Sequence, residues 1–121
     1  MPALLRALRW ILRLVAIVAL AFGIWLWTGH GFSTLRIHVM LGFVATAALL
    51  MIGVAALFRA VLPLGAIAIL WALALPIVGF GQMNWLVGPH HWTVEVVHLV
   101  IGLGSIGLGE VTAARSLRAE R

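Results

Sequence analysis

Four long apolar runs dominate the sequence and restrict what it can fold into. They extend roughly over residues 10–27, 35–58, 60–80 and 92–112. Each is close to the ~20 residues that an α-helix needs to cross the hydrocarbon core of a bilayer. The chain is 64% hydrophobic and only 9% charged, whereas about a quarter of the residues in a typical soluble domain are charged. We therefore predict an all-α membrane protein, a four-transmembrane-helix bundle that forms one domain over residues 1–121.

An internal repeat with a period of sixty residues subdivides this bundle. Ile-His-Val-Met-Leu-Gly at residues 37–42 recurs without a gap as Val-His-Leu-Val-Ile-Gly at residues 97–102. A repeat of fixed period indicates a duplicated structural unit. We predict two tandem helical hairpins, one over about residues 1–60 and one over about 61–121. If they pack as equivalents, the histidines of the two motifs face each other across a pseudo-twofold axis, as axial ligands of a metal or a flat cofactor do.

The first apolar run also has features of a cleaved signal peptide. Arg6, Arg9 and Arg13 lie before or at its start, and Ala19 and Ala21 form the small-residue pattern of a cleavage site. The run continues past that site to Trp27, however, and residues 17–27 match residues 77–87 of the predicted third span. We therefore expect this segment to be retained as the first transmembrane helix.

The arginines predict the orientation of the bundle. Those on the side of both termini and the middle loop are Arg6, Arg9, Arg13, Arg59, Arg115, Arg118 and Arg121. Only Arg36 lies toward the other side. The positive-inside rule therefore predicts cytoplasmic termini in a multi-pass inner-membrane protein, with all five histidines toward the periplasm. We attribute the net charge of +5 to arginines that face lipid headgroups in this topology, and we expect no nucleic-acid partner.

The residue types limit which metal or redox ligands the chain can supply. It contains no cysteine and no tyrosine. Thiolate-ligated iron–sulfur clusters, covalently attached c-type haem and disulfides are thereby excluded. Imidazole remains the principal ligand, with carboxylate and methionine as lesser candidates.

His38 and His98 carry the strongest functional signal. An ionisable side chain inside the bilayer costs on the order of a few kcal/mol unless it is partnered, and these two differ in predicted depth by only ~5 Å. Each is followed one turn later by a glycine, Gly42 or Gly102, whose bare backbone leaves room for a broad planar ring. The pattern favours haem iron held between two imidazoles. Another metal, a chlorophyll-type pigment, or interhelical hydrogen bonding without a cofactor remain alternatives.

Glycines deeper in the last span have a simpler interpretation. Gly104, Gly107 and Gly109 lie farther along the helix than a shallow ring would reach. Small residues let membrane helices approach closely. We expect these three glycines to serve helix packing.

The chain resembles the membrane b-type cytochromes, in which a four-helix bundle holds haem b between histidines of different helices. The resemblance rests on this architecture and on the pair His38-x3-Gly42 and His98-x3-Gly102. Members of the cytochrome b561-like group have four ligands for two haems, one near each membrane face. This sequence has no histidine in the inner half of any span. The resemblance therefore implies one haem near the outer face, and no complete path for electrons across the membrane.

Four further residues near the outer end are assigned to this cofactor site. Arg36 is placed to pair with a haem propionate, or else it anchors its helix at the interface. His30 and His90 are a second symmetric pair, in loops where propionates or the exposed haem edge would lie; joint ligation of a second metal with His91 is a weaker alternative. Glu95 lies one turn from His98 and is suited to orient an imidazole or accept a proton from a quinol, unless it sits in the headgroup region.

The sequence thus predicts an electron-transfer subunit with one bis-histidine haem b near the periplasmic face. Electrons would be exchanged with a quinol or a soluble redox partner. Because little of the chain lies outside the membrane, we expect it to act within a larger membrane complex or a homo-oligomer and not as an enzyme alone. A metal-binding or pigment-binding membrane subunit and a structural subunit that packs through its glycines are the alternative functions.

Overall fold

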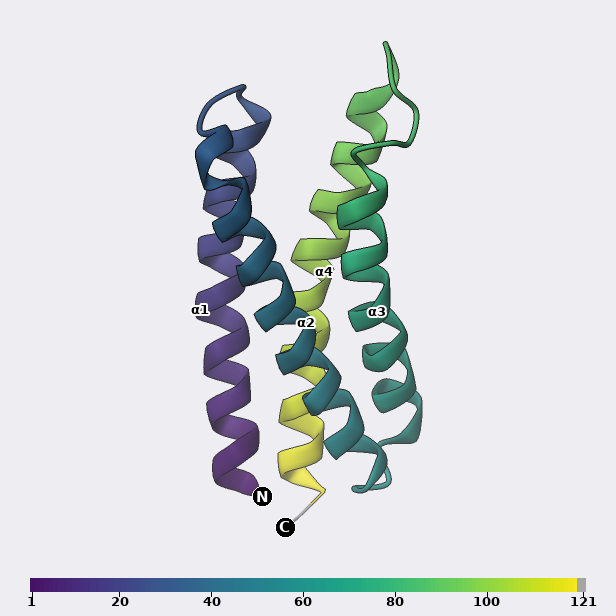
Figure 1. Cartoon of the computed structure of the whole chain (residues 1–121). Helices are drawn as coiled ribbons and strands as arrows, with labels where there is room; N and C mark the ends of the chain where they lie inside the picture. Colours follow the sequence, from purple (N-terminus) through teal and green to yellow (C-terminus); the bar gives the residue numbers. More distant parts are fainter. Residues whose placement is uncertain (120–121) are drawn as a thin grey trace.

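Four α-helices make up most of the computed structural model, which describes residues 1–119 (Figure 1). They are α1 (Pro2–Trp27), α2 (Leu35–Leu57), α3 (Leu62–Gly81) and α4 (His91–Arg118), with a short 3-10 turn, η1 (Phe32–Thr34), before α2. No strand occurs among residues 1–119. Each α-helix is long and apolar enough to cross a membrane, which confirms the prediction of an all-helical, membrane-type chain. Arg121 lies outside the described residues.

The two hairpins of the fold, α1–α2 and α3–α4, diverge along their length. Both termini lie at the same end of the bundle as the turn between α2 and α3 (Figure 1). We call this the terminal end, and we call the other the loop end because it carries the loops 28–34 and 82–90. The helices lie close together at the terminal end, and the two hairpins separate toward the loop end (Figure 1).

The helix limits differ from the predicted spans at the charged and glycine-rich ends. α1 begins at Pro2, not near residue 10, and α4 continues to Arg118, not 112. Apolar runs underestimate both helices because their polar ends still form backbone hydrogen bonds. α3 ends at Gly81. The match of residues 77–87 to residues 17–27, which are helical, therefore does not extend to the structure beyond Gly81. There the chain turns, and the indole of Trp85 folds back against Gly81.

Glycines allow close contacts between helices at several points in the bundle. At the α2–α3 crossing, a Cβ atom on Gly53 would lie 3.0 Å from the carbonyl oxygen of Gly65. The packing expected for the α4 glycines is found at Gly104, which faces the indole of Trp71, and at Gly109, which faces Leu12. A Cβ atom on Gly107 would meet nothing within 4 Å, so the packing prediction is wrong for this glycine. Without a hydrophobic driving force inside lipid, such close contacts are a main source of helix association.

A cluster of charged side chains ties α1 to α4 near the terminal end. The Arg9 Nε donates to Glu110 Oε2 at 2.5 Å, and Arg13 Nη2 donates to the same oxygen at 2.6 Å. Arg13 also donates through Nε to Glu110 Oε1. The Arg13 guanidinium lies 4.8 Å from the ring centroid of Trp10. These bonds explain why the charged segment of α1 continues as a helix alongside α4.

Most of the large buried apolar side chains belong to the terminal half of the bundle. They include Leu5, Leu8, Leu12, Leu49 and Ile52. The packed core therefore lies away from the histidines. The loop-end half, where the hairpins diverge, is left with room for a ligand.

Candidate functional site

An apolar cavity of about 380 Å³ lies between the two hairpins in the loop-end half of the bundle. All four α-helices contribute to its walls, and most of the lining side chains are aliphatic or aromatic. The polar lining residues are His38, Gln82, His91, Glu95, His98 and Ser105. A concave, mostly apolar space of this size with a few convergent polar groups is typical of a cofactor or small-molecule site.

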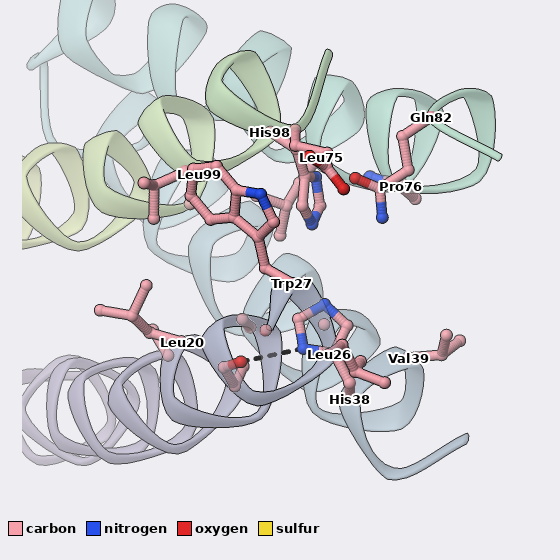
Figure 2. Close-up of a pocket in the computed structure, with 18 of the residues that line it drawn as sticks. Leu20, Leu26, Trp27, His38, Val39, Leu75, Pro76, Gln82, His98 and Leu99 are labelled. Atoms are coloured by element: carbon pink, nitrogen blue, oxygen red, sulfur yellow. Dashed lines mark hydrogen bonds between the residues drawn. The ribbon is translucent and has the colours of Figure 1, made fainter. Parts of the chain in front are cut away.

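His38 on α2 and His98 on α4 face each other across this cavity (Figure 2). Their ring centroids are 6.0 Å apart, and the ring planes are inclined by 68°. Figure 2 shows a ring nitrogen of each imidazole turned toward the other ring. The structure thus brings together, from opposite hairpins, the two histidines that the sequence predicted as a pair.

Each imidazole also packs against a glycine of the neighbouring helix in its own hairpin. A Cβ atom on Gly23 of α1 would lie 3.2 Å from Cε1 of His38, and one on Gly79 of α3 would lie 3.3 Å from Cε1 of His98. Sequence reasoning missed both glycines, because the sixty-residue period does not relate them. The first helix of each hairpin therefore contacts its histidine from a position that does not correspond in the sixty-residue alignment. The only sequence signal for these contacts is that a glycine occurs in the apolar run before each histidine.

The Nδ1 atoms of the two histidines have different surroundings. His38 Nδ1 lies 2.9 Å from the backbone carbonyl oxygen of Ala19. Because a carbonyl can only accept, this nitrogen carries the proton, and Nε2 of His38 is left with its lone pair for a ligand. His98 Nδ1 is buried and has no hydrogen-bond partner within residues 1–119.

Gly42 and Gly102, one turn beyond the histidines, both line the cavity. A Cβ atom built on either glycine would meet nothing within 4 Å. The backbone of α2 and α4 is therefore directly exposed to the cavity on both sides. This is the open surface against which a flat ring can lie.

Glu95 is half-buried and lines the cavity one turn before His98 on α4. His91 lies one further turn toward the loop end, also in the lining, and its Nδ1 is 3.2 Å from the carbonyl oxygen of Trp85. Both proton-exchanging groups belong to the same helix. The α1–α2 side of the cavity presents apolar side chains at this level, among them Trp27 and Phe32.

Three of the residues assigned from the sequence lie outside the cavity. Arg36, His30 and His90 are exposed and do not line it. The Nδ1 of His30 is 3.2 Å from Thr28 Oγ1, and its ring lies 5.3 Å from that of Trp25. No group of three or more histidine, aspartate or glutamate side chains within residues 1–119 is arranged to hold a metal ion. The loop histidines therefore do not form a second metal centre with His91.

Comparison with protein-family models, with curated proteins and with solved structures finds no significant match to this chain. Its function therefore has to be argued from the site. Two imidazoles in an apolar cavity, with bare backbone on both helices, can coordinate the metal of a planar cofactor from opposite sides.

Proposed function

We propose that this chain is a membrane electron-transfer cytochrome b subunit that holds one haem b between His38 and His98. The spacing of the two rings carries the proposal. Metal–imidazole bonds are about 2 Å long and a ring centroid lies about 1 Å behind the ligating nitrogen, so two imidazoles on opposite sides of one metal have centroids about 6 Å apart. The centroids of His38 and His98 are 6.0 Å apart.

The rest of the cavity also fits a haem. Gly42 and Gly102 leave open space on the helices that carry the ligands, and the lining is largely apolar. Haem supplies one-electron redox chemistry when it is bound. The protein's part is to orient the two imidazoles, exclude water and provide a low dielectric, all of which influence the potential. The backbone carbonyl of Ala19 contributes by fixing the tautomer and the orientation of His38.

A macrocycle is favoured over a bare metal ion because protein ligands are few. Two imidazoles alone leave most coordination positions of a transition metal unfilled. Within residues 1–119 no third histidine or carboxylate completes a metal site with them. Haem brings four ligands of its own. A chlorophyll-type pigment is the second candidate, because it also has a planar macrocycle whose metal accepts imidazole.

The proposed topology places the haem near the periplasmic face of the inner membrane. The terminal end carries most of the arginines, and the positive-inside rule assigns such an end to the cytoplasm. We infer that the hairpins are tandem copies and that both contribute one ligand. Arg36, His30 and His90 are exposed at the loop end, where they would meet the propionates or the outer haem edge. Because Glu95 lines the cavity on α4, the propionates are better placed on the α1–α2 side.

The proposed partners follow from the position of the site. Electrons would be exchanged at the loop end with a quinol or a soluble redox protein. Glu95 and His91 line this part of the cavity and can accept protons that a quinol releases. Because helices make up nearly all of the described chain, we infer that it works within a larger membrane complex or a homo-oligomer.

The absorption spectrum of the protein purified from haem-replete cells tests this proposal. We expect a Soret band, and an α-band that sharpens on reduction with dithionite. Gly102→Leu fills the cavity side of α4 and should abolish both bands. Gly107→Leu is the matched control on the same helix, at a position whose Cβ also meets open space but which does not line the cavity. This control should retain the spectrum.

Two results would overturn the proposal. A folded but colourless wild-type protein would exclude haem. A haem spectrum that survives intact in Gly102→Leu would place the haem outside the cavity. A pigment would be recognised by absorption bands that do not respond to dithionite and by a metal other than iron in elemental analysis.

A further inference from the structure

The two proposed axial ligands are held unequally by the protein around them. The imidazole of His38 is fixed by a hydrogen bond from Nδ1 to the carbonyl oxygen of Ala19, 2.9 Å away. The Nδ1 of His98 is buried but has no partner within residues 1–119. Leu75, Pro76 and Gln82 line the same cavity as His98, and the only hydrogen bond drawn in Figure 2 is that of His38.

This difference has a chemical consequence for metal binding. A hydrogen bond accepted from Nδ1–H fixes the ring and makes Nε2 a stronger donor to a metal, and removal of such a partner typically lowers metal affinity about 10–100-fold. His38 has this support and His98 lacks it. The two histidines are therefore inequivalent ligands although they belong to similar sequence motifs.

The helices that pack against the two histidines also differ, and again the support for His98 is the weaker one. α1, which supplies the carbonyl for His38, has no proline after its first turn. α3, which packs on His98 through Gly79, contains Pro76 one turn earlier. A proline inside a helix removes one backbone hydrogen bond and allows a bend at that point. The helix that packs against His98 thus lacks a backbone hydrogen bond that the helix against His38 retains.

The geometry points to His38 as the anchoring ligand of the haem and His98 as the exchangeable one. The inference rests on the proposed function and adds a property to the same site. The haem stays bound through His38 when the bond to His98 is lost. A small neutral ligand that favours reduced haem iron can then take the position of His98.

Haem titration of two single variants of the full chain tests the order of the ligands. His98→Ala leaves the supported histidine, whereas His38→Ala leaves the unsupported one. We expect His98→Ala to bind added haemin at least tenfold more tightly than His38→Ala, and to show a five-coordinate, high-spin spectrum. Circular dichroism and gel filtration establish that each variant is folded. Equal affinities, or tighter binding by His38→Ala, would overturn the inference.

Carbon monoxide added to the dithionite-reduced wild-type protein provides a second measurement that needs no variant. We expect the Soret band to shift, because carbon monoxide displaces His98. A reduced spectrum unchanged under saturating carbon monoxide would overturn the inference and leave the proposed function standing. A wild-type protein that binds no haem would overturn the proposed function itself, so the two failures are distinguishable.

Gln82→Ala tests whether His98 has a hidden partner. Gln82 lines the cavity and lies beside His98 in Figure 2. If His98 has no partner, any change in the haem affinity of this variant comes without a stronger response to carbon monoxide. A weaker affinity accompanied by a stronger response would show that the Gln82 side chain supports His98, and the assignment of His98 as the unsupported ligand would be wrong.

Discussion

Adding one methyl group at the α2–α3 crossing, with Gly53→Ala, should show how much close helix packing contributes to the free energy of unfolding. A Cβ atom on Gly53 would lie 2.9 Å from Ile69 Cγ1, 3.0 Å from the Gly65 carbonyl oxygen and 3.1 Å from the Ile69 backbone nitrogen. Two of these three atoms are backbone, so they cannot rotate away. Gly53→Ala therefore forces α2 and α3 apart.

The cost follows from the separation. Ordinary carbon contacts begin near 3.4 Å, so the helices must move apart by roughly half an ångström, and a gap of 0.5–1 Å already removes about a quarter to a half of each dispersion contact. Overpacking of this kind costs about 1–3 kcal/mol. Alanine recovers up to about 1 kcal/mol of helix propensity relative to glycine. The net destabilisation of Gly53→Ala should be about 0–2 kcal/mol.

Gly107→Ala is the matched control, because a Cβ atom there meets nothing within 4 Å. Both variants gain the same helix propensity, so the difference between them isolates the packing cost of about 1–3 kcal/mol. Reversible unfolding in mixed micelles with increasing sodium dodecyl sulfate, followed by circular dichroism, measures both. If Gly53→Ala proved as stable as Gly107→Ala, the crossing would not be closely packed and the reasoning would fail.

Four further substitutions probe the contacts around the core and the site. Glu110→Gln leaves two guanidinium groups without their carboxylate, so we expect a lower unfolding midpoint in the same assay. Trp71→Phe removes the indole N–H bond to the Ile101 carbonyl and should cost about 1 kcal/mol; no loss would mean that this bond adds no net stability. Gly23→Ala and Gly79→Ala press on the imidazole rings from 3.2 and 3.3 Å and should broaden the reduced α-band, whereas unchanged spectra would show that the rings have room to move.

The sequence predicts the helices well because the bilayer leaves few alternatives. A run of about 20 apolar residues in lipid must satisfy its own backbone hydrogen bonds, so length and composition nearly determine a helix. The predicted span 35–58 accordingly agrees with α2, Leu35–Leu57. The apolar runs missed the ends of α1 and α4, residues 2–9 and 113–118, because these turns carry arginines while their backbones still form helical hydrogen bonds.

Some features of the site could likewise be predicted from the sequence, and others could not. That His38 and His98 face each other was predictable, since the two sequence motifs that contain them match at a spacing of sixty residues. The partners of their rings were not. Gly23, Gly79 and the Ala19 carbonyl depend on the register between helices, which no local pattern encodes.

The unequal distribution of packing along the bundle leads to a last prediction. The buried core and the α1–α4 ion pairs lie in the terminal half, whereas the cavity occupies the loop-end half. Removal of both proposed ligands should therefore abolish haem binding without unfolding the chain. The double variant His38→Ala, His98→Ala should retain the helical circular dichroism and the gel-filtration volume of the wild type.

Its unfolding midpoint should fall only by what the ligand contributes. Bound haem adds RT ln(1 + [L]/Kd), about 2.7 kcal/mol when its free concentration is a hundred times Kd. The double variant should therefore match the wild-type protein purified without haem and should not respond to added haemin. Because a haem-dependent core would instead leave the variant unfolded or aggregated, that outcome would show that the cofactor, and not the glycine and arginine contacts of the terminal half, holds the two hairpins together.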